Sequence, residues 1–269
     1  MENKNFSDFY ENFFNISDYN SYRYDVGSFC TRQLIISNIK QTSGNLLEIG
    51  TGISSIIQDL NNFNCYGIDY SKNAINFTEQ ILKKLNKKAN LTIGNAEKLP
   101  YDDNFFDVII TSHTLEHIKN DFNVIKECLR VLKNNGELII FVPGRVSGIS
   151  TNEEFTKYGH YRYYNAKRFK ELEISTNLQL SLIKIIYPHK IHNLIWNKLK
   201  RYFRYANYPI KKFILKDNKS YEERKFYQKI LLPKIAYILN KLDNIIEKKE
   251  ANFLGTEFNV LAVFKKSSI

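Results

Sequence analysis

Cysteine, proline, methionine and tryptophan are all scarce in this chain of 269 residues. The three cysteines, Cys30, Cys65 and Cys128, are odd in number and far apart, which argues against a disulfide framework and a cysteine metal site. We expect buried, reduced thiols and predict no metal site. No stretch approaches the roughly 20 uncharged apolar residues of a membrane-spanning helix, and no apolar signal-peptide run follows the first residues. These absences predict a cytoplasmic protein.

Hydrophobic residues make up 43% of the chain and aromatic residues 14%, which suffices for one large α/β domain with an elaboration. The formal net charge is +11. Residues 183–250 carry all of this charge, with 17 Lys and Arg against 6 Asp and Glu. The basic character therefore belongs to one segment, which favours a local anionic partner over a duplex gripped by the whole protein.

Strand and helix patterns alternate from residue 45 onward. Apolar runs predict strands, and amphipathic stretches predict helices between them. This rhythm predicts an α/β fold with a doubly wound, Rossmann-like, mostly parallel sheet covered on both faces. The seven predicted strands are residues 45–49, 65–68, 91–93, 106–111, 137–142, 180–187 and 255–264, the helices between them are 54–60, 71–85, 120–132 and 165–176, and residues 144–164 are predicted as a loop.

Two further segments are predicted to be helical. Residues 1–43 read as an N-terminal helical lid of two helices, with Tyr22 and Tyr24 placed to contact a substrate. A surface helix packed by its aromatic stripe is the alternative for this segment. Residues 189–252 read as a basic helical cap inserted before the last strand. The sheet domain then comprises residues 44–188 and 253–269.

Glycines or polar residues follow four of the predicted strands. Gly50 and Gly52 form a tight corner, where the exposed amides of the next helix suit a carboxylate or phosphate. Asp69, about twenty residues on, can accept two hydrogen bonds from a ribose diol. Ligands bind beyond the carboxyl ends of parallel strands, so we expect one shared site. The remaining two segments are Asn95-Ala96-Glu97, a polar turn suited to an adenine edge, and Thr111-Ser112-His113, which opens a loop toward the same crevice.

Five stretches carry a family resemblance: LLEIGTGIS, CYGIDYS, GNAEKLPYDDNFFDVI, SHTLEHI and LRVLKNNGELIIFVP. Residues 45–142 thereby resemble the class I S-adenosylmethionine-dependent methyltransferases of the UbiE-like group, also called methyltransferase type 11. The resemblance implies S-adenosylmethionine as cofactor and S-adenosylhomocysteine as product. It also implies that the strand ends bind this cofactor. Glu48, Gly50 and Gly52 would then lie along the methionine and ribose, and Asp69 would bind the ribose hydroxyls. Asn95 and Ala96 would flank the adenine, Thr111 and His113 would lie near the methyl donor, and the neighbouring residues Thr51, Tyr70, Glu97 and Ser112 would complete the cofactor site.

The chain departs from the family pattern at two positions. Ser54 stands where a third glycine is usual, and Asn95 stands where an adenine-contacting Asp is usual. The Asn95 carbonyl can still accept from an exocyclic amine. A nicotinamide dehydrogenase fits this sequence less well, because the corner lacks its third glycine and the turn at residues 95–100 is typical of methyltransferases.

The downstream sequence GHYRYY, residues 159–164, resembles a GHxRRY-type segment of methyltransferases encoded among surface-polysaccharide genes. His160 is the first candidate for a general base, and His113 is the second, because an imidazole titrates near neutrality. Arg162, Tyr163 and Tyr164 are predicted to contact the acceptor. Alternatively, His160 anchors a loop and Arg162 pairs with a nearby glutamate. Tyr163 replaces the second arginine of the pattern, so a double-arginine clamp is absent.

The sequence therefore predicts a methyltransferase acting on a hydroxyl, amine or phosphate group of a small or glycan-related acceptor, in surface polysaccharide biosynthesis. One alternative is methylation of a quinone or another aromatic metabolite. Another is a non-catalytic protein of this fold that binds RNA or a partner through its cap. Contact between residues 189–250 and the anionic inner face of the membrane is a further hypothesis for the cap, against a merely solvated surface. We expect no nucleic acid partner.

Overall fold

The computed structural model describes residues 26–52, 55–186, 238 and 258–268. Most of the predicted lid, with Tyr22 and Tyr24, and nearly all of the predicted cap lie outside these residues. The described strands are β1 (Gly44–Ile49), β2 (Phe63–Asp69), β3 (Asn90–Ile93), β4 (Phe106–Ser112), β5 (Leu132–Gly144), β6 (Leu180–Ile186) and β7 (Phe258–Lys266). The described helices are α3 (Val26–Ser37), α4 (Lys72–Lys84), α5 (Asp121–Val131), α6 (Asn152–Tyr158) and α7 (Ala166–Ser175). Two short 3-10 turns are η1 (Ile56–Asp59) and η2 (Leu115–His117).

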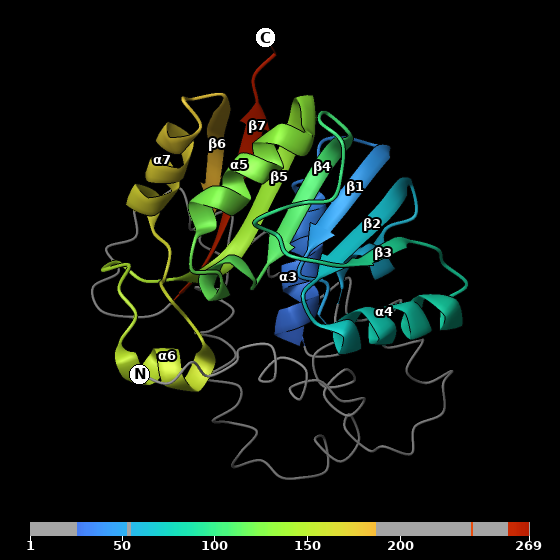
Figure 1. The fold of residues 1–269 in the computed structure, drawn as a ribbon, viewed down its shortest axis with the longest axis horizontal. Helices are drawn as coiled ribbons and strands as arrows, with labels where there is room; N and C mark the ends of the chain where they lie inside the picture. Colours follow the sequence, from blue (N-terminus) through green and yellow to red (C-terminus); the bar gives the residue numbers. More distant parts are fainter. Residues whose placement is uncertain (1–25, 53–54, 187–237, 239–257, 269) are drawn as a thin grey trace.

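All seven strands form one sheet in the order β3-β2-β1-β4-β5-β7-β6 (Figure 1). Strands β1 to β5 run parallel to one another, and β7 runs antiparallel to both β5 and β6. The predicted seven-stranded, mostly parallel α/β sheet is thus confirmed. The strand order reverses between β1 and β4, which is the point where open parallel sheets bind ligands beyond their carboxyl ends.

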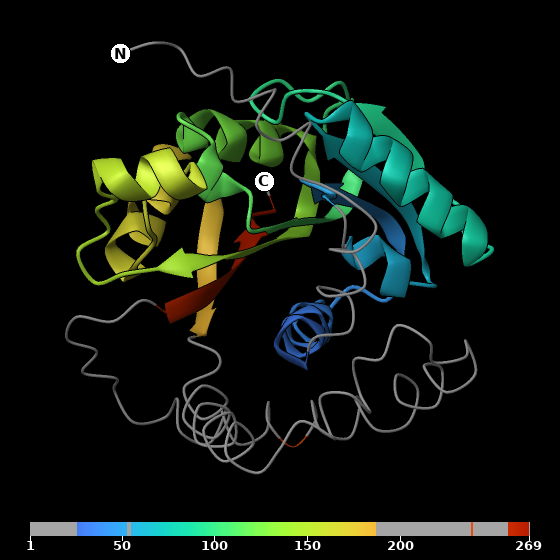
Figure 2. The ribbon, with the colours of Figure 1, turned by 90° about the horizontal axis from the view of Figure 1, so that it is seen from below.

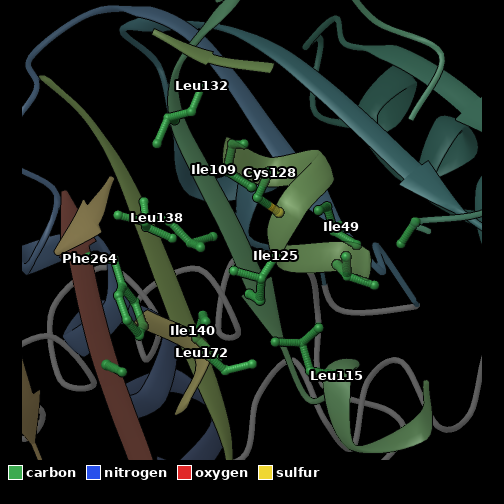
Figure 3. Packing of buried hydrophobic residues seen from close by; sticks show 14 of the residues in the cluster. Ile49, Ile109, Leu115, Ile125, Cys128, Leu132, Leu138, Ile140, Leu172 and Phe264 are labelled. Carbon is green, nitrogen blue, oxygen red and sulfur yellow. The ribbon is translucent and has the colours of Figure 1, made fainter. Parts of the chain in front are cut away.

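Hydrophobic side chains are buried on both faces of the sheet. Along β5, Leu138 and Ile140 join one cluster while Ile139 and Phe141 join the other, as the two-residue period of a strand requires. Helices α5 and α7 cover the first face, and α3 covers the second (Figure 2). Figure 3 shows Ile125 and Cys128 of α5 packed against strand residues of the first cluster, including Ile109.

Helix α3 belongs to this core, although the sequence assigned it to the lid. Leu34 and Ile35 are buried in the second cluster, 4% and 0% exposed. Arg32 donates from Nε to the Asp59 carboxylate at 3.1 Å, which ties α3 to η1. Helix α3 therefore packs on the second face of the sheet and contacts the turn η1, which follows the corner after β1.

The predicted helix over residues 54–60 is described only as the 3-10 turn η1. The carboxylate of Glu48 accepts the Ile56 amide at 2.8 Å and the Ile57 amide at 3.1 Å, so a side chain satisfies the amides that begin this turn. Helix α4 begins as predicted, with Ser71 as its N-cap accepting the Ala74 amide at 3.1 Å.

Helix α6 was not predicted, because residues 144–164 were interpreted as a loop. Thr151 and Glu154 form a capping box, in which each side chain bonds the backbone amide of the other residue. Residues 134–136 lie within β5, before the part of that strand predicted from the sequence. There Asn135 has a φ of 64°, and the register with β4 shifts.

Candidate active site

The corner after β1 requires glycine at its first position. Gly50 has a φ of 77°, and its amide donates to the Ile68 carbonyl at 2.8 Å. A Cβ on Gly50 would lie 2.0 Å from Oγ1 of Thr114. Thr114 also donates to the Ser112 carbonyl at 3.1 Å, which holds it at the end of β4. The first glycine thus permits close contact between the ends of β1 and β4.

The surroundings of Gly52 differ from those of Gly50. Its φ is 49°, and no atom of the described residues lies within 4 Å of a Cβ built on it. Its amide donates to Oδ2 of Asp69 at 2.9 Å, while Oδ1 of Asp69 accepts the Ser71 amide at 2.9 Å. The Asp69 carbonyl accepts the Gly94 amide at 2.9 Å. Asp69 therefore joins the ends of β1, β2 and β3, beside open space at Gly52.

Glu48, which the sequence predicted to line the ligand, is buried beneath the corner. Glu48 is only 2% exposed, and its carboxylate accepts the Ser55 hydroxyl in addition to the Ile56 and Ile57 amides. The amides expected to face a carboxylate or phosphate are thus bound within the protein. Glu48 therefore stabilises the corner through hydrogen bonds made inside the protein.

The turn after β3 folds on its own polar groups. Oδ1 of Asn95 accepts the Glu97 amide at 2.8 Å, and the Asn95 carbonyl accepts the Lys98 amide at 3.0 Å. Asn95 is exposed, whereas Ala96 is 9% exposed and belongs to the first core cluster. Tyr70, directly after Asp69, is 62% exposed. Asn95 and Tyr70 are therefore accessible on the β2–β3 side.

Two threonines at the corner and at the end of β4 have buried hydroxyl groups. Thr51 is 2% exposed and Thr111 is 1% exposed. Neither Oγ1 has a hydrogen-bond partner within the described part of the chain. Buried polar atoms normally have partners, so these two hydroxyls are unusual. Thr51 follows β1 and Thr111 lies near the end of the adjacent parallel strand β4, so they lie one at each side of the reversal in strand order.

His113 follows β4 with a φ of 52°, and its amide donates to the Phe141 carbonyl at 2.8 Å. Its side chain is 49% exposed, and Nδ1 lies 3.5 Å from Oε1 of Glu116. Glu116 itself is fully buried, and among the described residues no donor forms a hydrogen bond to either carboxylate oxygen. Burial acts to raise the pKa of Glu116, but the imidazoles of His113 and His117 outweigh it and lower that pKa.

His160 lies beside this carboxylate and not at the open corner. Its ring centroid is 4.9 Å from that of His117 and 5.4 Å from that of Tyr163. Side-chain ligand atoms of Glu116, His117 and His160 lie within 4.8 Å of one another. The structure thus brings together His117 and His160, which are far apart in the sequence.

Arg162, which the sequence predicted to contact an acceptor, forms several contacts within the protein. Its guanidinium donates to the Ile118 carbonyl at 2.6 Å and the Lys119 carbonyl at 2.5 Å. It also lies 3.4 Å from the buried carboxylate of Asp121. These contacts fasten residues 159–164 to the loop after β4.

The two predicted acceptor tyrosines are buried as well. Tyr164 is 0% exposed, and its hydroxyl donates to Asp121 at 2.9 Å. Tyr163 is 2% exposed, and the guanidinium of Arg145 lies 4.0 Å from its ring centroid. Both rings are therefore packed inside the fold, and their contact with an acceptor stays a prediction.

Sequence reasoning missed Thr114 and Glu116 as site residues. Glu116 was visible as the acidic member of the SHTLEHI stretch, but only the fold reveals that it is buried between histidines. Thr114 had no signal beyond its place after a predicted strand. Its role depends on the position of Gly50, 64 residues earlier in the sequence.

Comparisons with known proteins agree with this architecture. A family model described as a methyltransferase domain matches residues 47–140. A demethylmenaquinone methyltransferase of Bacillus mycoides is 32% identical over 97 residues, which are 36% of this chain and 41% of that protein. An uncharacterized protein of Methanocaldococcus jannaschii is 28% identical over 149 residues, 55% of this chain and 59% of that one. The chain thus spans about two to three fifths of the length of these relatives.

Solved structures share the fold at low sequence identity. Phosphoethanolamine N-methyltransferase 2 of Haemonchus contortus, in complex with phosphomonomethylethanolamine and S-adenosylhomocysteine, has a TM-score of 0.68 at 18% identity, covering 99% of this chain and 61% of that chain. The [4+2]-cyclase SpnF has a TM-score of 0.56 at 16% identity, covering 89% and 82%. The second neighbour shows that this fold alone does not specify methyl transfer.

The matched segment and the strand order together define the class. Residues 47–140 match a methyltransferase domain, and this segment together with its relatives supports the class I S-adenosylmethionine-dependent methyltransferases of the UbiE-like group. Within the described residues, no helix is long and apolar enough to span a membrane.

Proposed function

We propose that this protein is an S-adenosylmethionine-dependent methyltransferase acting on a small acceptor. The observation that carries the proposal is the contact of Asp69 with Gly52 beside open space at the reversal of strand order. A carboxylate has capacity for further hydrogen bonds after accepting two amides. Asp69 is therefore suited to bind the hydroxyl groups of a ribose.

The residues at the corner fit this cofactor. Gly52 offers close approach to the backbone, and the buried hydroxyls of Thr51 and Thr111 lack partners among the described residues. Asn95 and Tyr70, both accessible, are proposed to flank the adenine and the ribose. We propose that the backbone of three further residues lines the cofactor site, namely Ala96, Glu97 and Ser112. Glu48 stabilises the corner through its hydrogen bonds to the Ile56 and Ile57 amides.

When bound, S-adenosylmethionine supplies a methyl group already activated by its positively charged sulfur. The protein must then hold the acceptor in line and take up its proton where needed. We propose His113 for this proton, because it is half exposed at the end of β4. His160 was the first candidate from sequence, but its ring packs against His117 and Tyr163.

The acceptor is proposed to be a hydroxyl, amine or phosphate group of a glycan-related molecule in surface polysaccharide biosynthesis. Support comes from the GHYRYY sequence, although the structure gives Arg162, Tyr163 and Tyr164 internal contacts. A quinone is the second candidate, because relatives named demethylmenaquinone methyltransferase match the domain. The basic segment 183–250 supports an additional proposal, contact with an anionic membrane surface or an anionic acceptor.

A methyl-transfer assay with isotope-labelled S-adenosylmethionine tests these proposals over three acceptor classes: sugar phosphates and nucleotide sugars, primary amines, and demethylated quinones. We expect labelled product in the first class. Labelled quinone alone would instead favour the second candidate. The variant H113N should lose turnover while keeping its affinity for S-adenosylhomocysteine, and unchanged turnover would remove His113 from the proposal. No transfer to any class, combined with no cofactor binding, would contradict a methyltransferase function.

A further inference from the structure

Glu116, His117 and His160 form a side-chain cluster that the proposed methyl transfer does not use. Two imidazoles and one carboxylate are the donor set typical of transition-metal sites with open coordination positions. Their ligand atoms lie within 4.8 Å of one another. Oε1 of Glu116 and Nε2 of His117 are 3.8 Å apart.

These distances are close to those of an assembled site. Ligand atoms that share one zinc ion lie about 3.3–4.2 Å apart, given metal–ligand distances of about 2.0–2.1 Å. Side-chain movements of roughly 1 Å or less would therefore bring the three atoms onto one ion. Glu116 and His117 come from the turn η2, and His160 comes from the segment after α6.

The carboxylate of Glu116 provides an independent indication of a cation. The residue is fully buried, and within the described ranges neither of its oxygens accepts a hydrogen bond. The nearest imidazole nitrogens, on His113 and His117, lie 3.5 and 3.8 Å from Oε1. A buried carboxylate is unfavourable unless a positive charge accompanies it, and a metal ion would supply that charge while the imidazoles stay neutral.

The ring of His117 is oriented as a metal ligand requires. Its Nδ1 lies 3.3 Å from the Gly159 carbonyl, and a carbonyl oxygen can only accept. In this hydrogen bond Nδ1 carries the hydrogen, so the neutral ring has its lone pair on Nε2, which lies 3.8 Å from Oε1 of Glu116. Metal-binding histidines usually donate their other ring N–H to a carbonyl or carboxylate in this way.

From these observations, we propose that Glu116, His117 and His160 bind one divalent first-row transition metal ion of the zinc type. The ion joins the loop after β4 to residues 159–164 and keeps coordination positions for oxygen ligands, such as water or an acceptor hydroxyl. His113, one turn away, is not a member of the ligand set. The inference stands independently of the proposed methyl transfer.

Calorimetric titration of the tag-free, metal-stripped full chain with ZnCl2 tests the site, with MgCl2 in parallel. We expect one Zn²⁺ per chain and much weaker Mg²⁺ binding, because imidazole ligands favour transition metals. Replacing a residue that only hydrogen-bonds to a metal ligand typically lowers metal affinity about 10- to 100-fold. Glu116 and His160 are proposed as ligands themselves, so E116Q and H160Q should each weaken Zn²⁺ binding more than about 100-fold. H160Q changes a partly exposed side chain, and it provides the test if E116Q does not fold.

The two remaining histidines provide the matched control. The double variant H189N/H192N should bind Zn²⁺ like the wild type. Cobalt substitution should produce visible absorption without the near-ultraviolet thiolate band that cysteine ligands would add. The proposal would be overturned by any of four results. These are the absence of 1:1 Zn²⁺ binding, an unchanged Zn²⁺ affinity in both E116Q and H160Q, an equal affinity for Mg²⁺, and a loss of Zn²⁺ binding in H189N/H192N alone. Cofactor binding is measured separately, so failure here leaves the methyltransferase proposal unaffected.

Discussion

The carboxylate of Asp69 accepts the amide of Gly52 at 2.9 Å, although 17 residues separate them in the sequence. This hydrogen bond connects the end of β2 to the corner after β1. It fixes the corner in a left-handed conformation whose Cβ side is open. The same carboxylate is the group proposed to bind the ribose, so one side chain both shapes the site and contacts the cofactor.

The two glycines of the corner should respond differently to alanine. G50A places a Cβ 2.0 Å from Thr114 at a φ of 77°, so strain and overlap should cost about 3 kcal/mol of unfolding free energy. G52A meets no atom of the described part of the chain within 4 Å and should cost only about 1–2 kcal/mol, for its positive φ. Chemical denaturation measures both values.

Cofactor affinity should follow the opposite order among folded variants. G52A should weaken binding of S-adenosylhomocysteine, because the new methyl group occupies the proposed approach of the cofactor. Equal unfolding free energies for the two variants would contradict the tight contact at Gly50. Unchanged affinity in G52A would contradict the open approach at Gly52.

Replacing Arg162 should affect stability and not acceptor recognition. R162A removes two hydrogen bonds to the Ile118 and Lys119 carbonyls and an ion pair to buried Asp121. The unfolding free energy should fall by about 2–4 kcal/mol in chemical denaturation. K126A, an exposed cation on α5, should change it little. Wild-type stability in R162A together with a raised KM for the acceptor would instead restore the predicted acceptor contact.

Glu127 should make the protein sensitive to acid. The hydrogen bond from Arg130 holds the pKa of Glu127 below its ordinary 4.5, with a further contribution from the Leu99 amide. A folded pKa below the unfolded one gives stability that is present above the unfolded pKa and is lost as the pH falls through the folded one. E127Q should therefore be destabilised by about 1–2 kcal/mol at neutral pH, and the difference from wild type should shrink on acidification.

Denaturation at a series of pH values measures this convergence. E79Q, at an exposed position on α4, is the control and should remain close to wild type throughout. A gap between wild type and E127Q that stays constant down to acid pH would show that the ionised carboxylate is not the stabilising species.

The sequence was sufficient for the sheet because its strands are apolar on both sides. Leu138 to Phe141 alternate between two cores, a pattern that only a strand covered on both faces permits. The glycine corner and Asp69 were also predictable, because strand ends and left-handed turns have strong residue preferences. Helix α6 was predictable too, since Thr151 and Glu154 have capping-box spacing.

The roles of individual polar side chains were not predictable from local sequence. Glu48 and Arg162 resemble ligand-binding residues in the chain, yet each is bound by backbone groups brought close by folding. The same limit applies to Glu116, whose burial between imidazoles depends on how η2 packs. A side chain's partners arise from tertiary contacts, and spacing along the chain does not encode them.

Calorimetric titration with S-adenosylhomocysteine tests the central claim most directly, comparing wild type with D69N and with the exposed control D102N. Wild type and D102N should bind one molecule per chain. D69N should bind at least about tenfold more weakly, since a charge-assisted hydrogen bond is worth about 1.5–3 kcal/mol. No binding by the wild type, or equal affinity in folded D69N, would contradict a cofactor site built on Asp69 and the corner at Gly52.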